Sequence, residues 1–382
     1  MKHYKLVIGK FMPPHMGHDY LIRFADAFRI DSSYSFQSIY DTKTLVIVCG
    51  MDSEPIDSFM RFDAMNEHYF GSGILISHLF KTMPQEPKDD PDFWDKWKSA
   101  IEEIAERNGL SGTPYVFASE PYGMKLAEVL NGHFIPVDVD RSIVPTSGTD
   151  IRNNMLKPIN WNKIIPEFRR RMQINVHIIG SESTGKTTLS RDIRETFDIM
   201  INGFNSSAGS VMTVVPEYAR GYLREYGDSN LSEQTWNDLF RSGITQLRTN
   251  IDSAIIVRDT SLITTVGWAT ILNPDYMAVT TSDRIEQLSM VDQTIRNTRN
   301  DLYFLLPDDV PFEVDPQRYG IYKRQSTKEF WKTLLDKYGI NPIVVPDENS
   351  GRPGPKYGSL YKKTNFMIYH ILKKFESNLK TT

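Results

Sequence analysis

The sequence contains a single cysteine, Cys49, among its 382 residues. One thiol excludes both an intrachain disulfide framework and a zinc centre built from cysteines. Cys49 ends the apolar run TLVIVC at residues 44–49, and a cysteine in such a run is usually buried. We therefore expect a structural thiol inside the core.

The sequence also lacks long apolar runs, a leader pattern and an excess of positive charge. No stretch approaches the about 18 unbroken apolar residues of a membrane span, and the first residues do not follow a signal-peptide layout. A net charge of −4 provides no basic footprint for nucleic acid. These absences predict a cytoplasmic protein without a membrane or nucleic-acid partner. The chain is long enough for two or three domains, each with its own core.

A glycine-rich segment in the middle of the chain carries the strongest functional signal. Residues 180–188 read GSESTGKTT, which fits G-x-x-x-x-G-K-[ST], between the apolar run 176–179 and a helical pattern that opens at Lys186. In this context backbone N–H groups and a helix N-terminus bind phosphates, the lysine reaches the β- and γ-phosphates, and the next hydroxyl holds Mg²⁺. The alternative is a chance glycine turn before a helix. The expected nucleotide-binding residues are Gly180, Ser183, Thr184, Gly185, Lys186, Thr187 and Thr188, with Thr187 also a metal ligand.

The position of this loop predicts two domains. A phosphate-binding loop normally follows the first strand of its domain, so the residues upstream must form a separate one. Paired asparagines and a proline at residues 153–158 interrupt the pattern there. We expect a first domain over residues 1–158, a short amphipathic connector over 159–173 and a second domain over 174–382. The basic cluster at 169–171 is expected to face water.

The first domain begins with a strand pattern at residues 4–8, followed by GKFMPPHMGH at 9–18 and a helical pattern. His15 and His18 then lie at the entrance of a helix, where free N–H groups suit the phosphates of a nucleotide. Two alternatives remain: a helix-capping turn with incidental histidines, and a zinc pair. No further zinc ligands stand nearby in the sequence.

Strand and helix patterns alternate through the rest of the first domain, which predicts a parallel, doubly wound α/β sheet with ligands beyond the carboxyl ends of its strands. The expected strands are 45–49, 74–78, 115–118 and 134–137, and the expected helices are 58–70, 92–108 and 123–130. Trp94 and Trp97 share one helix face. They are either core residues or a π-platform for a flat substrate.

The second domain shows the same alternation, with strands expected at 211–215, 254–257, 302–306 and 342–345 and helices at 326–338 and 365–375. Glu217 and Asp259 follow two of these strands, where a doubly wound sheet presents its ligands and a Walker-B acid binds magnesium. Either acid could instead cap the following helix. The proline- and charge-rich segment after residue 306 predicts a mobile loop that carries Asp315 and Arg318, with Arg324 beyond it.

Two motifs of the first domain resemble those of the nucleotidyltransferase superfamily, namely residues 9–18 and SGTDIR at 147–152. The resemblance implies that His15 and His18 contact ATP phosphates while the second motif closes the site, so that a substrate phosphate displaces pyrophosphate from the α-phosphorus. Positioning and charge stabilisation then suffice, for which Lys10 and Arg152 are suited. The implied nucleotide-binding residues are Gly9, Lys10, Phe11, Gly17, Ser147 and Thr149.

With SEPYG at 119–123, VDVDR at 137–141 and the phosphate-binding loop, nearly the whole chain resembles the NadR-type bifunctional enzymes. The resemblance implies a nicotinamide mononucleotide adenylyltransferase followed by a ribosylnicotinamide kinase, with ATP as co-substrate and Mg²⁺ as cofactor. Nicotinamide riboside, nicotinamide mononucleotide and NAD are the other implied ligands, and a homo-oligomer is possible. The implied site residues of the kinase are Lys186, Glu217 and Asp259 for catalysis, Thr187 and Asp259 for metal, Arg318 and Arg324 for nucleotide, and Arg220 and Asp315 for substrate; Trp94 and Trp97 are the implied substrate residues of the transferase.

The chain departs from that family at three places. It begins four residues before its first strand pattern, so the helix-turn-helix of the repressor members is not expected. It has Asp259-Thr-Ser261 where the family has Asp-Thr-Asp, and Asp315-Pro-Gln-Arg318 where the family has Asp-Gly-x-Arg. The residues alone also allow another acceptor such as pantetheine phosphate, a non-catalytic NAD sensor, and a nucleotide switch or uncoupled ATPase in the second domain.

Overall fold

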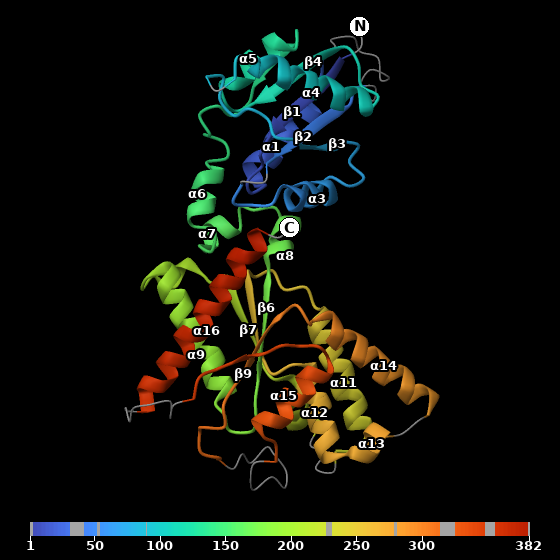
Figure 1. Cartoon of the computed structure of the whole chain (residues 1–382), viewed down its shortest axis with the longest axis vertical. Coiled ribbons are helices and arrows are strands. Elements are labelled where there is room, and N and C mark those ends of the chain that lie inside the picture. Colours follow the sequence, from blue (N-terminus) through green and yellow to red (C-terminus); the bar gives the residue numbers. More distant parts are fainter. Residues whose placement is uncertain are drawn as a thin grey trace. The chain divides into compact units, whose positions relative to one another are not determined.

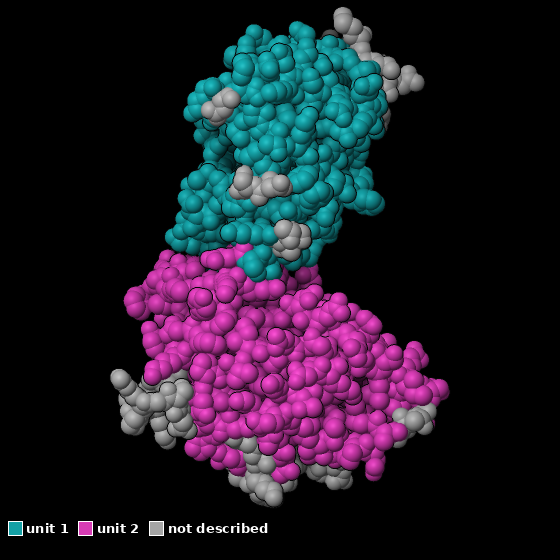
Figure 2. Space-filling model, in the orientation of Figure 1, with its two compact units in different colours: residues 1–172, 377–382 teal, residues 173–376 magenta. Residues whose placement is uncertain are grey.

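A computed structural model describes residues 3–30, 42–51, 54–88, 90–226, 231–278, 281–313, 325–347 and 356–380. The chain divides into two compact units (Figure 2): unit 1 comprises Met1–Met172 and Ser377–Thr382, and unit 2 comprises Gln173–Glu376. Within the described ranges, no helix has both the length and the apolar character needed to cross a membrane.

Unit 1 is a five-stranded parallel sheet in the order β3-β2-β1-β4-β5, covered by helices (Figure 1). Its strands are β1 (His3–Gly9), β2 (Thr44–Gly50), β3 (Leu75–Phe80), β4 (Thr113–Ala118) and β5 (His133–Pro136). Its helices are α1 (Met16–Ala27), α3 (Ser58–His68), α4 (Phe93–Arg107), α5 (Tyr122–Val129), α6 (Gly148–Asn153), α7 (Pro158–Trp161) and α8 (Pro166–Met172).

The central strands of unit 1 are buried on both faces, which explains why β2 is almost continuously apolar. Leu6 and Leu45 point to the face that α4 and α5 cover, in one core with Ile101 and Leu126. Helices α1 and α3 lie against the other face (Figure 1). β1 lies between β2 and β4, and the chain reaches β4 from β3, so the order of the strands reverses at β1. Ligands of such sheets bind beyond the carboxyl ends at this point.

Unit 2 is a second five-stranded parallel sheet, in the order β10-β9-β6-β8-β7. Its strands are β6 (Ile174–Ile179), β7 (Met212–Val215), β8 (Ile255–Asp259), β9 (Leu302–Leu305) and β10 (Ile343–Val344). Its helices are α9 (Lys186–Asn202), α10 (Tyr218–Tyr226), α11 (Glu233–Arg248), α12 (Leu262–Leu272), α13 (Pro274–Ala278), α14 (Ser282–Asn297), α15 (Lys328–Lys337) and α16 (Lys356–Leu379), with a 3₁₀ turn at Ser206–Ala208.

Helices cover both faces of this second sheet (Figure 1). One face packs against α11, α12, α14 and α15 through a core that includes Trp236, Phe240 and Trp331, all fully or almost fully buried. Helix α9 contacts the strands β6, β7 and β8. The strand β6 lies at the centre of this sheet and leads directly into the phosphate-binding loop.

The predicted fold class is confirmed: both units are parallel α/β sheets, and the strands begin and end within a few residues of the predicted ranges. Three expectations need correction. Unit 1 extends to Met172 because Phe168 and Met172 are fully buried, so the expected connector belongs to that unit, apart from its last residue. The terminal helix runs over Lys356–Leu379 instead of 365–375, and its last residues from Ser377 belong to unit 1. The basic cluster does not simply face water, because Arg170 and Arg171 pair with Glu67.

Candidate active sites

Unit 1 contains a cavity of about 790 Å³ that is lined by residues from the end of β1, from α1, α4 and α6, and from the loops after β2 and β4. The cavity brings together all the residues of unit 1 that the sequence singled out. They are Gly9, Lys10, Phe11, His15, Gly17, His18, Trp94, Trp97, Ser147, Thr149 and Arg152.

His15 is the N-cap of α1, as the capping alternative required. Its Nδ1 accepts hydrogen bonds from the backbone N–H groups of Gly17 at 3.1 Å and His18 at 3.4 Å. A Cβ on Gly17 would lie 3.1 Å from the His15 ring, so glycine leaves room for this cap. The rings of His15 and His18 stack with their centroids 3.7 Å apart. His15 therefore has a capping role, and its Nε2 remains for a ligand.

Both histidines are held neutral at physiological pH. Burial, followed by the charges of Arg141 and Lys163, lowers the pKa of His15 to about 3. Burial and the neighbouring His15 lower the pKa of His18 well below its usual value. The Nδ1 of His18 is buried without a hydrogen-bond partner among the described residues. A buried polar atom of this kind normally has a partner, and the oxygen of a bound phosphate could be that partner.

The second motif contacts the first one directly. Ser147 caps α6 by accepting from the N–H of Asp150 at 3.1 Å. From this helix Arg152 donates to the carbonyl of Met12, in the loop before His15, and to the hydroxyl of Thr149 at 2.9 Å. A Cβ on Gly148 would lie 3.0 Å from the same Met12 carbonyl. Two segments that are distant in sequence thus form one rim of the cavity.

A buried charged group beneath this rim escaped the sequence analysis. Arg61 is completely buried and donates to the backbone carbonyls of Lys10 and Cys49, at the ends of β1 and β2, and to the carboxylate of Glu54. Glu54 in turn pairs with the ammonium group of Lys10 at 3.2 Å. In the sequence, Arg61 is one charged residue within the helix expected over 58–70, and no local pattern marks it as buried. Arg61 holds Lys10 and Glu54 in place at the cavity wall.

Both tryptophans of α4 are half-buried, pack against the core and also line the cavity. The indole N–H of Trp97 donates to the carbonyl of Pro84 at 3.0 Å, which fixes its ring at the wall. Core packing and ligand contact are therefore compatible at these positions.

The phosphate-binding loop of unit 2 has the expected local geometry. Gly185 has φ +81°, a left-handed conformation that glycine adopts without strain, and Ser183 has φ +57°. The Nζ of Lys186 donates to the carbonyls of Gly180 at 2.9 Å and Ser181 at 2.7 Å, so its side chain folds over the loop. Thr184 is buried, whereas Thr188 is exposed on α9.

Thr187 and Asp259, the two residues predicted as metal ligands, lie in direct contact. The Thr187 hydroxyl donates to Oδ2 of Asp259 at 2.5 Å, and Oδ1 of Asp259 is buried without a partner among the described residues. A hydroxyl and a carboxylate with a spare oxygen are ligands that Mg²⁺ accepts alongside phosphates and water. Among the described residues, no group of three or more His, Cys, Asp or Glu side chains could hold a metal, so a cation at Thr187 and Asp259 would need phosphate oxygens and water as further ligands.

Charges of both signs surround Asp259. Glu217 accepts from Nε of Arg220 at 2.6 Å, as an ion pair at the start of α10. Burial, above all, raises the pKa of Asp259; the charge of Glu217 adds to the shift, while the Thr187 hydrogen bond and the Lys186 and Arg220 charges oppose it. Four neighbouring side chains therefore act on the carboxyl group of Asp259.

A second buried acid, Glu182, also escaped the sequence analysis. It lies inside the glycine loop, is fully buried, and accepts from the Gln325 N–H at 2.7 Å, the Ser326 N–H at 3.3 Å and the Ser326 hydroxyl at 2.7 Å. The loop is thus anchored to the chain just before α15. Ser261, which replaces an acid of the family pattern, is the N-cap of α12. Asp315, Arg318 and Arg324 lie outside the described residues.

Comparisons with known proteins extend this picture. Residues 175–352 match a family model described as an AAA domain. The trifunctional NAD biosynthesis/regulator protein NadR of Escherichia coli (strain K12) is 25% identical over 346 residues, which cover 88% of this chain and 77% of that protein. A crystal structure of a NadR protein in complex with NR matches 98% of this chain and 96% of its own, with a TM-score of 0.54 and 22% identity. Another, in complex with NAD and AMP-PNP, matches with a TM-score of 0.51 and 21% identity over 99% and 97% of the two chains. The chain is homologous to NadR and shares its fold.

Proposed function

We propose, from this homology to NadR and from the two sites, that the chain is a bifunctional enzyme of NAD biosynthesis. Unit 2 phosphorylates nicotinamide riboside with ATP to give nicotinamide mononucleotide. Unit 1 joins the mononucleotide to ATP and releases pyrophosphate and NAD. The observation that carries the proposal is the meeting of the two nucleotidyltransferase motifs in one cavity, with a complete phosphate-binding loop beside Asp259 in unit 2. The NR, NAD and AMP-PNP complexes of NadR support these ligands.

In unit 2 the loop residues from Gly180 to Thr187 bind the triphosphate through backbone N–H groups. Lys186 moves from its two carbonyl partners to the phosphates when ATP arrives. Thr187 and Asp259 would hold Mg²⁺, which neutralises charge that develops on the transferred group. Asp259 or Glu217 orients the riboside 5′-hydroxyl, whose oxygen attacks the γ-phosphorus while ADP leaves and the hydroxyl proton is released.

In unit 1 the neutral His15 and His18 donate hydrogen bonds to ATP phosphates at the start of α1. A phosphate oxygen of the mononucleotide attacks the α-phosphorus of ATP, the bond to the bridging oxygen breaks, and pyrophosphate leaves with the electron pair. Lys10 and Arg152 stabilise the charge on the phosphates. No side chain needs to form a covalent bond, so the protein contributes position and charge.

The acceptor of each reaction can be tested on the full chain by comparing several acceptor compounds in the same assay. Pyrophosphate release is measured with nicotinamide mononucleotide and with pantetheine phosphate, and ADP release with nicotinamide riboside and with common nucleosides. We expect the nicotinamide compounds to be preferred in both assays. A preference for pantetheine phosphate would show that unit 1 uses this acceptor instead of nicotinamide mononucleotide. If no acceptor led to pyrophosphate release, unit 1 would be a non-catalytic sensor. ADP release that does not depend on an acceptor would make unit 2 an uncoupled ATPase.

A further inference from the structure

The segment after α7 is attached to the loop that carries the catalytic histidines. The N–H of Met16 donates to the carbonyl of Lys163 at 2.8 Å, and the N–H of Ile165 donates to the carbonyl of Pro14 at 3.2 Å. Between these bonds His15 and Ile164 form an antiparallel bridge. Ile164 and Ile165 are buried, so the attachment is part of the core. The histidine loop is therefore fixed by residues that the sequence placed in a connector.

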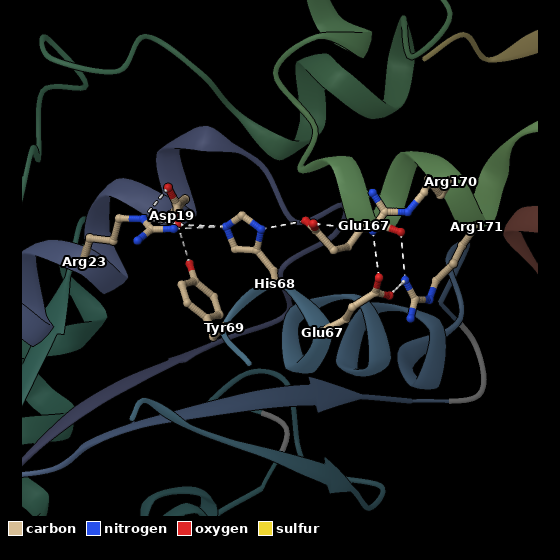
Figure 3. A network of polar contacts seen from close by, with 8 residues as sticks. All are labelled: Asp19, Arg23, Glu67, His68, Tyr69, Glu167, Arg170 and Arg171. Atoms are coloured by element: carbon tan, nitrogen blue, oxygen red, sulfur yellow. Dashed lines mark hydrogen bonds and ion pairs between the residues drawn. The ribbon is translucent and has the colours of Figure 1, made fainter. Parts of the chain in front are cut away.

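A network of polar and charged side chains makes a second attachment, which joins α1 to α8 through the end of α3 (Figure 3). Asp19 follows His18 directly in the first turn of α1. Its carboxylate accepts from Nε of Arg23 at 2.8 Å, from the hydroxyl of Tyr69 at 2.8 Å and from Nε2 of His68 at 3.1 Å. Any shift of Asp19 along or around α1 would also shift the stacked histidines, because a helical turn is rigid.

His68, the last residue of α3, connects Asp19 to α8. Its Nε2 faces Asp19, and its Nδ1 lies 2.6 Å from Oε2 of Glu167 (Figure 3). Both ring nitrogens thus face carboxylates. An imidazolium donates from both nitrogens, whereas a neutral imidazole can donate from only one. The geometry therefore selects the charged form.

The other charges around His68 leave this preference intact. Nη2 of Arg23 lies 3.5 Å from Nε2 of His68, but Arg23 is bound to Asp19. On α8, Arg170 lies 3.5 Å from Glu167 and 2.7 Å from Glu67, and Arg171 lies 2.8 Å from Glu67. The hydrogen bond with Asp19, and then Glu167, raise the pKa of His68 against the effect of burial. Burial opposes ionisation of Asp19, but bonds from His68, Arg23 and Tyr69 hold its pKa at about 2.

We propose that His68 is a positioning residue for adenylyl transfer, which acts by joining Asp19 on the histidine helix to Glu167 on α8. The inference rests on the proposed function of unit 1. His68 is not among the residues that line the cavity, and it works through the orientation of α1. Together with the bridge between His15 and Ile164, it fixes the histidine loop from both sides.

This role makes adenylyl transfer dependent on pH. The folded-state pKa of His68 is raised, so the bridge is complete below the ordinary histidine pKa of about 6.5. It is lost as the pH rises through the higher folded-state value. The kcat of unit 1 should therefore fall on the alkaline side through loss of the Glu167 or Asp19 bond. Glu167→Gln should weaken this fall, because the glutamine amide can donate to Nδ1 of a neutral imidazole that still donates from Nε2 to Asp19.

The test compares His68→Gln with wild type and with His133→Gln in the full chain. His133 is exposed on β5, so the control makes the same chemical change on the surface of the same unit. We expect His68→Gln to lower kcat for pyrophosphate release about tenfold at neutral pH with little change in KM, and to remove the alkaline fall. Riboside phosphorylation by unit 2 should be unchanged.

Amide exchange of residues 15–19 is measured on the same three proteins and needs no activity. We expect faster exchange in His68→Gln than in wild type or His133→Gln. Unchanged kcat, pH profile and exchange in His68→Gln would overturn the inference, as would a lower melting temperature with normal kcat in the folded fraction. If wild type released no pyrophosphate, the proposed function of unit 1 would fail instead. The exchange rates alone would then decide whether His68 positions α1.

Discussion

The hydroxyl of Thr187 donates to the carboxylate of Asp259 across 2.5 Å, which joins the start of α9 to the end of β8. In unit 2 these are the first turn after the phosphate-binding loop and the carboxyl end of the neighbouring strand. The second oxygen of Asp259 is buried without a partner among the described residues. This pair is where we expect the metal of the kinase to bind.

Replacing Asp259 by asparagine should abolish most riboside phosphorylation. Asparagine keeps the shape but removes the charge that would hold Mg²⁺. We expect kcat for ADP release to fall at least about 100-fold, or about 2.7 kcal/mol of transition-state stabilisation. Asp275→Asn, an exposed change of the same kind on α13, is the control. Adenylyl transfer by Asp259→Asn should match wild type, and an unimpaired kinase would rule out Asp259 as the metal ligand.

The raised pKa of Asp259 predicts an acid limit to the kinase that depends on magnesium. Burial favours the protonated carboxyl, which cannot bind a cation, so activity should fall with decreasing pH earlier than an ordinary aspartate would allow. Protons and Mg²⁺ compete for the same oxygen, so more magnesium should move the fall to lower pH. The measurement is kcat/KM for ADP release against pH at two magnesium concentrations. A fall that stays at the same pH would mean that another group titrates.

His15 has two roles, and two substitutions can separate them. Asparagine is a good N-cap, so His15→Asn should keep the stability of α1, whereas His15→Ala should lose about 1 kcal/mol. Both variants lack the imidazole that we propose as a phosphate ligand, so we expect both to lower adenylyl transfer to a similar extent. Thermal unfolding and pyrophosphate release are measured side by side. Full activity in His15→Asn would show that His15 only caps the helix.

Trp94 and Trp97 should contribute to acceptor binding as well as to packing. Stacking adds about 0.5 to 1.5 kcal/mol beyond burial, so alanine at either position should raise the KM for nicotinamide mononucleotide about two- to tenfold. Each ring is half-buried, so the stability cost should stay below the about 3 to 5 kcal/mol of a fully buried aromatic. The kinase provides the internal control. A large loss of stability without any change in KM would leave packing as their role.

Local patterns were sufficient to predict the strands of both sheets, whereas most residues that meet in the unit 1 cavity were implied by the resemblance of two motifs to a known superfamily. An apolar run between turn residues marks a buried strand wherever it occurs, and motif residues follow such strands. Helix α12 was not predicted. Its sequence LITTVGWATIL is apolar on nearly every side, so its apolar residues do not recur with the period of a helix. A buried helix of this kind resembles a long strand.

The buried charges could not be predicted because their partners are distant in sequence. Arg61 reaches Lys10 and Cys49, and Glu182 reaches Ser326, through contacts that exist only after folding. The same holds for the domain boundary. The proline and asparagines at 153–158 interrupt a local pattern, but residues 163–165 return to the histidine loop and make the following helix part of unit 1.

The most direct test of the account is the conversion of nicotinamide riboside and ATP into NAD by the full chain. Wild type should produce ADP, pyrophosphate and NAD. Lys186→Ala should form NAD only from added mononucleotide, His18→Ala should accumulate the mononucleotide, and a mixture of the two variants should restore NAD formation from the riboside. Riboside that is not consumed by wild type, or variants that each retain the whole conversion, would contradict the assignment of one reaction to each unit.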